Sequence, residues 1–146
     1  MHVLVFSQKK KEIKKYGIKT IITTETIGTK TITDSKVVYN ASGQVIEETN
    51  YNKEGVLKSI TKYKYNKSGD VIEEMEYDEK SVLKEKRYIK YNTLSEKTEE
   101  LVLDAKDKLL KKTVFTYDGR GFKTEKRIYG SNNNLISTKK VVYSNK

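Results

Sequence analysis

One short pattern, Tyr-(Asn/Asp)-x-x-Gly, returns along most of the 146-residue chain. Complete or shortened forms begin at eight tyrosines, namely Tyr39, Tyr51, Tyr65, Tyr77, Tyr91, Tyr117, Tyr129 and Tyr143. Leu103-Asp104 occupies the one missing place, so the spacing alternates regularly between 12 and 14 residues. A fixed internal period of this length is typical of repeat architectures, in which each copy is one supersecondary unit. The repeat therefore constrains the fold more than any other feature of the chain.

Each 26-residue copy has a 12-residue half and a 14-residue half. Short halves share the columns Val45-Ile46-Glu47-Glu48, Val71-Ile72-Glu73-Glu74 and Lys97-Thr98-Glu99-Glu100, with Lys123-Thr124-Glu125-Lys126 as a variant. Long halves share Leu57, Leu83, Leu109 and Leu135. We therefore expect one repeat domain over residues 13–146, with copies at 13–38, 39–64, 65–90, 91–116 and 117–142, preceded by a separate segment at 1–12. The first copy is degraded, as terminal copies of a repeat often are.

Each half is expected to form a turn followed by a strand. Asn or Asp favours the first turn position through its side-chain hydrogen bond, and Gly supplies the positive φ at the turn's end. The residues after Gly alternate with period two, as in Leu57, Ser59, Thr61, Tyr63 and Tyr65. Short turns between strands make neighbours antiparallel. The sequence thus predicts an all-β fold, an antiparallel β-meander of about ten strands in a thin single-layer or coiled open sheet.

The composition predicts a shallow core. Hydrophobic residues make up 35% of the chain and charged residues 34%, which is too little apolar side chain for two thick layers. The 11 tyrosines, the many β-branched residues and the absence of proline argue against disorder. We expect Lys and Glu stems and Tyr rings to cover much of the sheet.

The N-terminus has two interpretations. Val3–Phe6 form an apolar run followed by Ser7 and three lysines, which resembles the end of an export signal, although a whole hydrophobic region of such a signal has roughly 7–15 residues. The alternative is a short edge strand that begins the fold. No apolar stretch elsewhere is long enough to predict a transmembrane segment.

The net charge of +10 is unevenly distributed. Residues 1–38 and 91–146 each carry an excess of five positive charges, and residues 39–90 are neutral. Most basic residues lie among acidic ones, which is typical of a solvated surface and does not favour the continuous basic stripe of a nucleic-acid binder. Attraction of the basic ends to nucleic acid or anionic lipid is kept as a further alternative.

No residue cluster predicts an enzyme. Adjacent glutamates such as Glu47 and Glu48 point to opposite faces of a strand, so cross-strand ion pairs explain them better than acid–base catalysis. With a single histidine, His2, and no cysteine, the usual zinc sites and nucleophilic dyads are excluded, and we expect no metal and no cofactor. The Asn and Asp turns lack the acidic density that a calcium loop requires.

The eight repeat tyrosines are the candidate ligand-binding residues. Their alternation places them in ladders along the two ends of the strands. In the structural interpretation, each ring covers a turn and stacks on its neighbours, with the hydroxyl at the water boundary. In the functional interpretation, exposed rings form a platform for a sugar or peptide, and repeated weak sites add through avidity.

At its Tyr-(Asn/Asp)-x-x-Gly columns the chain resembles the tyrosine–aspartate (YD, or RHS-type) repeats of bacterial cell-surface and secreted proteins. The matching residues are Tyr39-Asn40 with Gly43, Tyr51-Asn52 with Gly55, Tyr65-Asn66 with Gly69, and Tyr117-Asp118 with Gly121. The alternation of two lengths departs from the single-length unit of that family, and this chain is too short to close the large β-shell of its long members. The resemblance implies a secreted, periplasmic or cell-surface location.

Together these observations predict a non-catalytic, exported repeat protein that acts as a structural or binding surface. Its expected partner is a protein or glycan at the cell surface, and the open sheet edges favour a homo-oligomer. A carbohydrate-binding module that uses the tyrosine ladder is the alternative.

Overall fold

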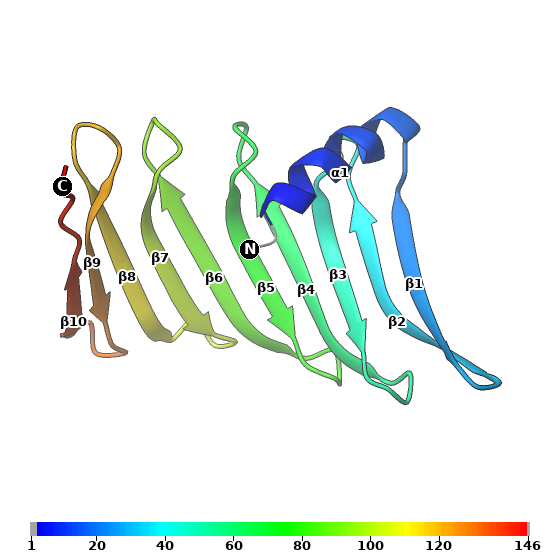
Figure 1. Cartoon of the computed structure of the whole chain (residues 1–146). Coiled ribbons are helices and arrows are strands. Elements are labelled where there is room, and N and C mark those ends of the chain that lie inside the picture. Colours follow the sequence, from blue (N-terminus) through cyan, green and yellow to red (C-terminus); the bar gives the residue numbers. More distant parts are fainter. Residues whose placement is uncertain (1–2, 146) are drawn as a thin grey trace. The chain divides into compact units, whose positions relative to one another are not determined.

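The computed structural model describes residues 3–145 and contains one helix and ten strands among them. The elements are α1 (Val3–Tyr16), β1 (Thr20–Ile27), β2 (Lys30–Tyr39), β3 (Val45–Tyr51), β4 (Leu57–Tyr65), β5 (Val71–Tyr77), β6 (Leu83–Tyr91), β7 (Lys97–Asp104), β8 (Leu109–Tyr117), β9 (Lys123–Tyr129) and β10 (Leu135–Lys140). The strands form one antiparallel sheet in chain order (Figure 1). The predicted all-β meander of about ten strands is therefore confirmed.

The chain divides into two compact units, which are described separately below. The N-terminal unit contains the residues up to Lys64 together with Met75–Leu83, and the C-terminal unit contains Tyr65–Glu74 and the residues from Lys84 onward. Within each unit the paired strands are consecutive hairpins, such as β3–β4 and β7–β8. The 26-residue copy thus corresponds to one hairpin.

The turns have the chemistry that the repeat predicts. In the turn after β2, the Asn40 side-chain oxygen accepts hydrogen bonds from the backbone N–H groups of Ser42 and Gln44, both at 3.0 Å. The Asn40 N–H donates to the Gln44 carbonyl at 2.9 Å, and Gly43, with φ of 76°, completes the turn. Asn52, Asp78, Asn92, Asp104 and Asp118 make the same pair of side-chain bonds. The Asn or Asp side chain therefore closes the turn, and the residue three positions later has a left-handed backbone.

Four turns hold a residue other than glycine in the left-handed position: Ser81, Ser95, Asp107 and Asn133, with φ between 57° and 65°. A left-handed backbone costs roughly 1–2 kcal/mol for a residue with a Cβ, and glycine loses more chain entropy on folding. We expect Ser95→Gly to raise the free energy of unfolding by about 0.5–1 kcal/mol. Asn133→Gly should give a smaller gain, because Asn tolerates this conformation better. Urea denaturation of both variants measures the free energy of unfolding. Equal gains for the two variants, or a loss of stability in Ser95→Gly, would contradict the prediction.

The N-terminal segment forms a helix, so the predicted edge strand at Val3–Phe6 is wrong. Helix α1 covers Val3–Tyr16 and crosses the expected boundary between residues 12 and 13, and the first copy becomes a strand only at Thr20. The physical reason lies in residues 8–15, which are rich in Gln, Lys and Glu, all good helix formers. A left-handed Gly17 then ends the helix in a Schellman motif, in which the Ile18 N–H donates to the Ile13 carbonyl at 3.0 Å.

The export-signal interpretation falls partly on residues 1 and 2, which lie outside the described residues, and it stays a prediction. Among the described residues, no helix has the length and apolarity that a membrane crossing requires.

Helix α1 lies across one end of the strands of the N-terminal unit (Figure 1) and contacts the turn after β2. A Cβ placed on Gly43 would lie 2.6 Å from the backbone oxygen of Lys10 and 3.3 Å from the backbone nitrogen of Lys14. On the same unit, Ile13 and Val45 are buried, with 4% and 8% of their surface exposed. The absence of a side chain at Gly43 therefore lets the helix backbone approach the sheet.

The core of the C-terminal unit is shallow. Cross-strand pairs place Ile89 opposite Glu100, Glu100 opposite Thr113, and Phe115 opposite Lys126, so these residues share one side of the sheet. We call this side the Arg87 face; its other members include Arg87 and Val102, which are paired across β6 and β7. Ile89, Val102 and Thr113 are buried on it, yet no described side chain is less than 2% exposed. Neighbouring polar side chains complete the burial of this face.

Candidate functional site

The repeat tyrosines end the strands. Seven of them are the last residues of β2, β3, β4, β5, β6, β8 and β9, and Tyr143 follows β10. The N-terminal unit holds Tyr39, Tyr51 and Tyr77, and the C-terminal unit holds Tyr65, Tyr91, Tyr117, Tyr129 and Tyr143. Tyrosines that end consecutive strands end antiparallel strands, so within a unit they lie at opposite ends of the sheet.

Three of the repeat tyrosines bind the backbone of the preceding strand. The hydroxyls of Tyr91, Tyr117 and Tyr143 donate to the carbonyls of Val71, Lys97 and Lys123, at 2.8, 2.7 and 2.8 Å. Burial, together with the negative charges of Asp70, Glu74 and Glu100, raises the pKa of Tyr91, and burial with Glu96 raises the pKa of Tyr117. These hydroxyls are thus engaged within the sheet, and only the ring surfaces remain for a ligand.

Two other repeat tyrosines, Tyr77 and Tyr129, each have a lysine ammonium over the ring. The ammonium of Lys62 lies 5.4 Å from the ring centroid of Tyr77, and that of Lys112 lies 5.4 Å from the ring centroid of Tyr129. Contacts of this kind stabilise an exposed surface by about 0.5–1 kcal/mol each. The structure does not bring the eight tyrosines into a single site.

The paired glutamates divide between the two faces of the sheet. Glu99 faces Lys90 at 2.8 Å and Lys112 at 4.0 Å, and its neighbour Glu100 binds Lys97 at 2.9 Å on the other face. In the N-terminal unit, Glu47 pairs with Lys62 at 3.8 Å. The predicted cross-strand ion pairs are therefore present. Among the described residues, no group of three or more His, Asp and Glu side chains has the arrangement of a metal site.

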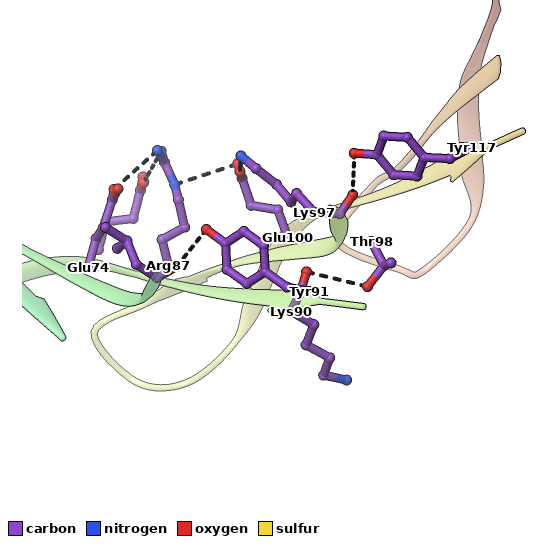
Figure 2. Close-up of polar contacts among 10 residues, drawn as sticks. Glu74, Arg87, Lys90, Tyr91, Lys97, Thr98, Glu100 and Tyr117 are labelled. Atoms are coloured by element: carbon purple, nitrogen blue, oxygen red, sulfur yellow. Dashed lines mark hydrogen bonds and ion pairs between the residues drawn. The ribbon is translucent and has the colours of Figure 1, made fainter. Parts of the chain in front are cut away.

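Arg87 is the centre of an ionic network on the Arg87 face (Figure 2). Its guanidinium lies 3.3 Å from Glu74, 3.4 Å from Glu85 and 3.6 Å from Glu100. Glu100 also accepts a hydrogen bond from Lys97, so one chain of charges runs from β5 to β7. With two cations and three carboxylates, the network carries a net charge of −1, and its ion pairs link β5, β6 and β7.

Glu100 gives this network a dependence on pH. Burial of its carboxylate raises the pKa, but Lys97, Arg87 and Lys111 outweigh burial and leave the pKa below its ordinary value of 4.5. A carboxyl group with a lowered folded-state pKa adds stability above its unfolded-state pKa, and this stability is lost as pH falls through the folded-state value. We expect Glu100→Gln to destabilise the protein at pH 7, and the difference from the parent should shrink below about pH 4.5. Urea denaturation across this range measures it. Glu54→Gln, in an exposed turn, controls for the loss of one charge.

A second cluster lies beside the network and gathers positive charge. The ammonium nitrogens of Lys123, Lys97 and Lys126 lie 4.6, 5.6 and 6.0 Å from the ring centroid of Phe115. We call these four residues the Phe115 cluster. Lys97 is ion-paired with Glu100, whereas no ion pair is formed by Lys123 or Lys126 in the described part of the chain. The repeat pattern alone did not predict this cluster, although one sign of it is visible in the sequence, where the column of Glu48, Glu74 and Glu100 ends in Lys126.

An exposed aromatic pair adjoins the Phe115 cluster. The rings of Phe122 and Tyr143 stack with centroids 4.9 Å apart, and both residues are 46% exposed. The Tyr143 hydroxyl donates to the carbonyl of Lys123, which connects the pair to the cluster. Arg120 lies over the Phe122 ring at 4.9 Å. This end of the C-terminal unit therefore combines accessible rings with excess positive charge.

Comparisons with known proteins give likeness of fold only. No protein-family model matches the chain, and no curated protein matches it. Among solved structures, a porin-like protein from Bacteroides uniformis is similar at TM-score 0.45 and 16% identity, over 87% of this chain and 52% of that chain. A protein of unknown function from Bacteroides fragilis is similar at TM-score 0.45 and 17% identity, over 87% of this chain and 95% of that chain. The chain thus spans about half the length of the porin-like protein.

Proposed function

We propose that the chain is a non-catalytic, exported protein built from YD-type repeats, whose sheet serves as a structural and binding surface and joins other copies at its edges. The observation that carries this proposal is the strand order, in which β1 and β10 each have a neighbour on one side only. An outer edge presents backbone N–H and C=O groups that can pair with another chain. Tyrosine-ended strands and Asx-closed turns support the YD-type assignment, from which export follows as an expectation.

The two edges are complementary in direction and charge. Because all neighbouring strands are antiparallel, the β1 of a second copy beside β10 continues the same pattern. Strand β1 contains one charged residue, Glu25, and β10 contains Lys139 and Lys140. Exposed apolar side chains occur on both, with Ile22 59% and Ile136 64% exposed. These features favour a head-to-tail contact between β10 of one copy and β1 of the next.

Light scattering of single-residue edge variants tests the proposal. We expect the parent protein to associate as its concentration rises, and Ile22→Lys or Ile136→Lys to stay monomeric, because a charge on either edge blocks a head-to-tail contact. Mixing the two variants should restore dimers, since each retains the edge that the other has lost. Val56→Lys, at a 57% exposed turn residue between inner strands, should associate like the parent. A parent that stays monomeric at high concentration would overturn edge association.

A further inference from the structure

We propose that the end of the C-terminal unit formed by the Phe115 cluster and the Phe122–Tyr143 pair binds an acidic polysaccharide. In this interaction the lysines contact carboxylate or sulfate groups, and a sugar ring lies against the exposed aromatic rings. The proposal goes beyond the edge association described above and shares only Lys139 of β10 with it.

Positive charge without a carboxylate partner is concentrated around the Phe115 ring. Three ammonium groups lie within 6.0 Å of one point, the Phe115 ring centroid, and only that of Lys97 has a carboxylate partner. Lys126 also lies directly opposite Lys139 in the pairing of β9 with β10. Like charges directly opposite each other on a sheet are destabilising. An anionic ligand would remove this repulsion.

The residues at the start of the short-half strands differ between the copies. The short-half strands begin with Val45 and Val71 in two copies, and with Lys97 and Lys123 in the next two. Three residues later the charge reverses from glutamate to Lys126 in the last of these copies alone. Two other short halves therefore fold with an uncharged first residue and an acidic fourth residue. Lys97 has Glu100 as a partner, but Lys123 and Lys126 are not required by the hairpin, so the fold does not explain their position.

The surroundings of the Phe115 cluster favour an acidic polysaccharide over nucleic acid as the anion. Lysine ammoniums already lie over the Phe115 ring, so this ring offers little surface for stacking a nucleic-acid base. The cluster also ends at Glu100 and the Arg87 network, which has more carboxylates than cations, and it does not continue as a basic stripe along the unit. Phe122 and Tyr143 are each 46% exposed beside Lys123, with Arg120 lying over the Phe122 ring and Tyr143 stacked against it. A ligand with apolar ring faces and regularly spaced acidic groups, such as an acidic polysaccharide, fits this combination better than nucleic acid.

The test replaces two lysines of the cluster with the residues that earlier copies have at the same positions. Lys123→Val with Lys126→Glu reproduces the columns of Val45 and Glu48 and lowers the net charge by three. Lys106→Val with Lys108→Glu lowers the charge by the same amount in an exposed turn of the same unit. Binding of polygalacturonate, dextran sulfate, neutral dextran and an oligothymidylate is measured by isothermal titration calorimetry at low salt. Circular dichroism checks the fold of each variant.

We expect the parent to bind at least one acidic polysaccharide and not to bind neutral dextran. Tighter binding of polygalacturonate would indicate recognition of carboxylate groups, and tighter binding of dextran sulfate would indicate recognition of sulfate groups. The cluster variant should bind about tenfold more weakly, because each lost charge contact contributes a fraction of a kcal/mol. The turn variant should lose much less, and Phe122→Ala should also weaken binding. Equal losses in both charge variants, absence of binding, or tighter binding of the oligothymidylate would overturn the proposal.

Should the double variant not fold, Lys139→Gln at the edge strand is expected to weaken binding, and an unchanged affinity would reject the site.

Discussion

Gly43→Ala should be among the most damaging single substitutions in the N-terminal unit. The new methyl group would lie 2.6 Å from the Lys10 carbonyl oxygen, at a residue whose φ is 76°. The left-handed backbone costs roughly 1–2 kcal/mol and overpacking against the helix about 1–3 kcal/mol more. We expect the free energy of unfolding to fall by about 2–4 kcal/mol and amide hydrogens of α1 to exchange faster.

Gly55→Ala is a matched control for this prediction. Gly55 has φ of 77° in the equivalent position of the next turn, and its added Cβ would meet only Ile32, at the ordinary contact distance of 3.6 Å. It should lose about 1–2 kcal/mol, the backbone cost alone, and leave exchange in α1 unchanged. Equal effects of the two substitutions would show that the helix does not depend on the turn after β2.

Ile89→Ala should have the largest effect in the C-terminal unit. Ile89 is 7% exposed on the Arg87 face, opposite Glu100. Truncation of a buried isoleucine to alanine costs about 2–5 kcal/mol, through lost burial and the cavity that remains. The cost depends on how far the site can collapse, and because the core of this unit is shallow we expect the lower half of this range.

Ile136→Ala provides the comparison within the same unit, because Ile136 is 64% exposed. Exposed substitutions usually change stability by less than about 0.5 kcal/mol. Guanidinium denaturation of both variants measures the contrast. A loss for Ile89→Ala as small as that for Ile136→Ala would mean that the shallow core of the Arg87 face contributes little to folding.

Much of the fold was predictable because the repeat fixes local structure directly. Asn40 and its equivalents predicted the turns, and the structure places a strand end at each repeat tyrosine within the described strands. Alternating residues then predicted antiparallel neighbours. Helix α1 was not predictable from the repeat, since it lies largely outside it. Its evidence was of another kind: good helix formers from Gln8 to Lys15 and a glycine at position 17 that supplies the C-terminal cap.

The sites were less predictable than the fold. The repeat tyrosines were visible in the sequence, but the acceptors of their hydroxyls were not, because those contacts depend on how adjacent strands are staggered. Register shifts occur beside Tyr39, Tyr91 and Tyr117, where an extra residue enters the ladder. The Phe115 cluster combines lysines from the start of β7 and from β9 around a ring on β8. The change from Glu to Lys at position 126 was visible, whereas this convergence required coordinates.

The tyrosine hydroxyl bonds have a consequence for how such a chain can change its length. Tyr117 ends β8 and bonds the carbonyl that begins β7, so it fastens the end of the hairpin remote from the Asp104 turn. Tyr91 and Tyr143 do the same for β5–β6 and β9–β10. Each such hairpin is therefore held at its turn by hydrogen bonds within its own 26-residue copy, and at its open end by the tyrosine that follows that copy. Duplication or deletion of a whole copy would leave no hydroxyl and no turn without its partner, so chains of this design can lengthen or shorten in hairpin steps.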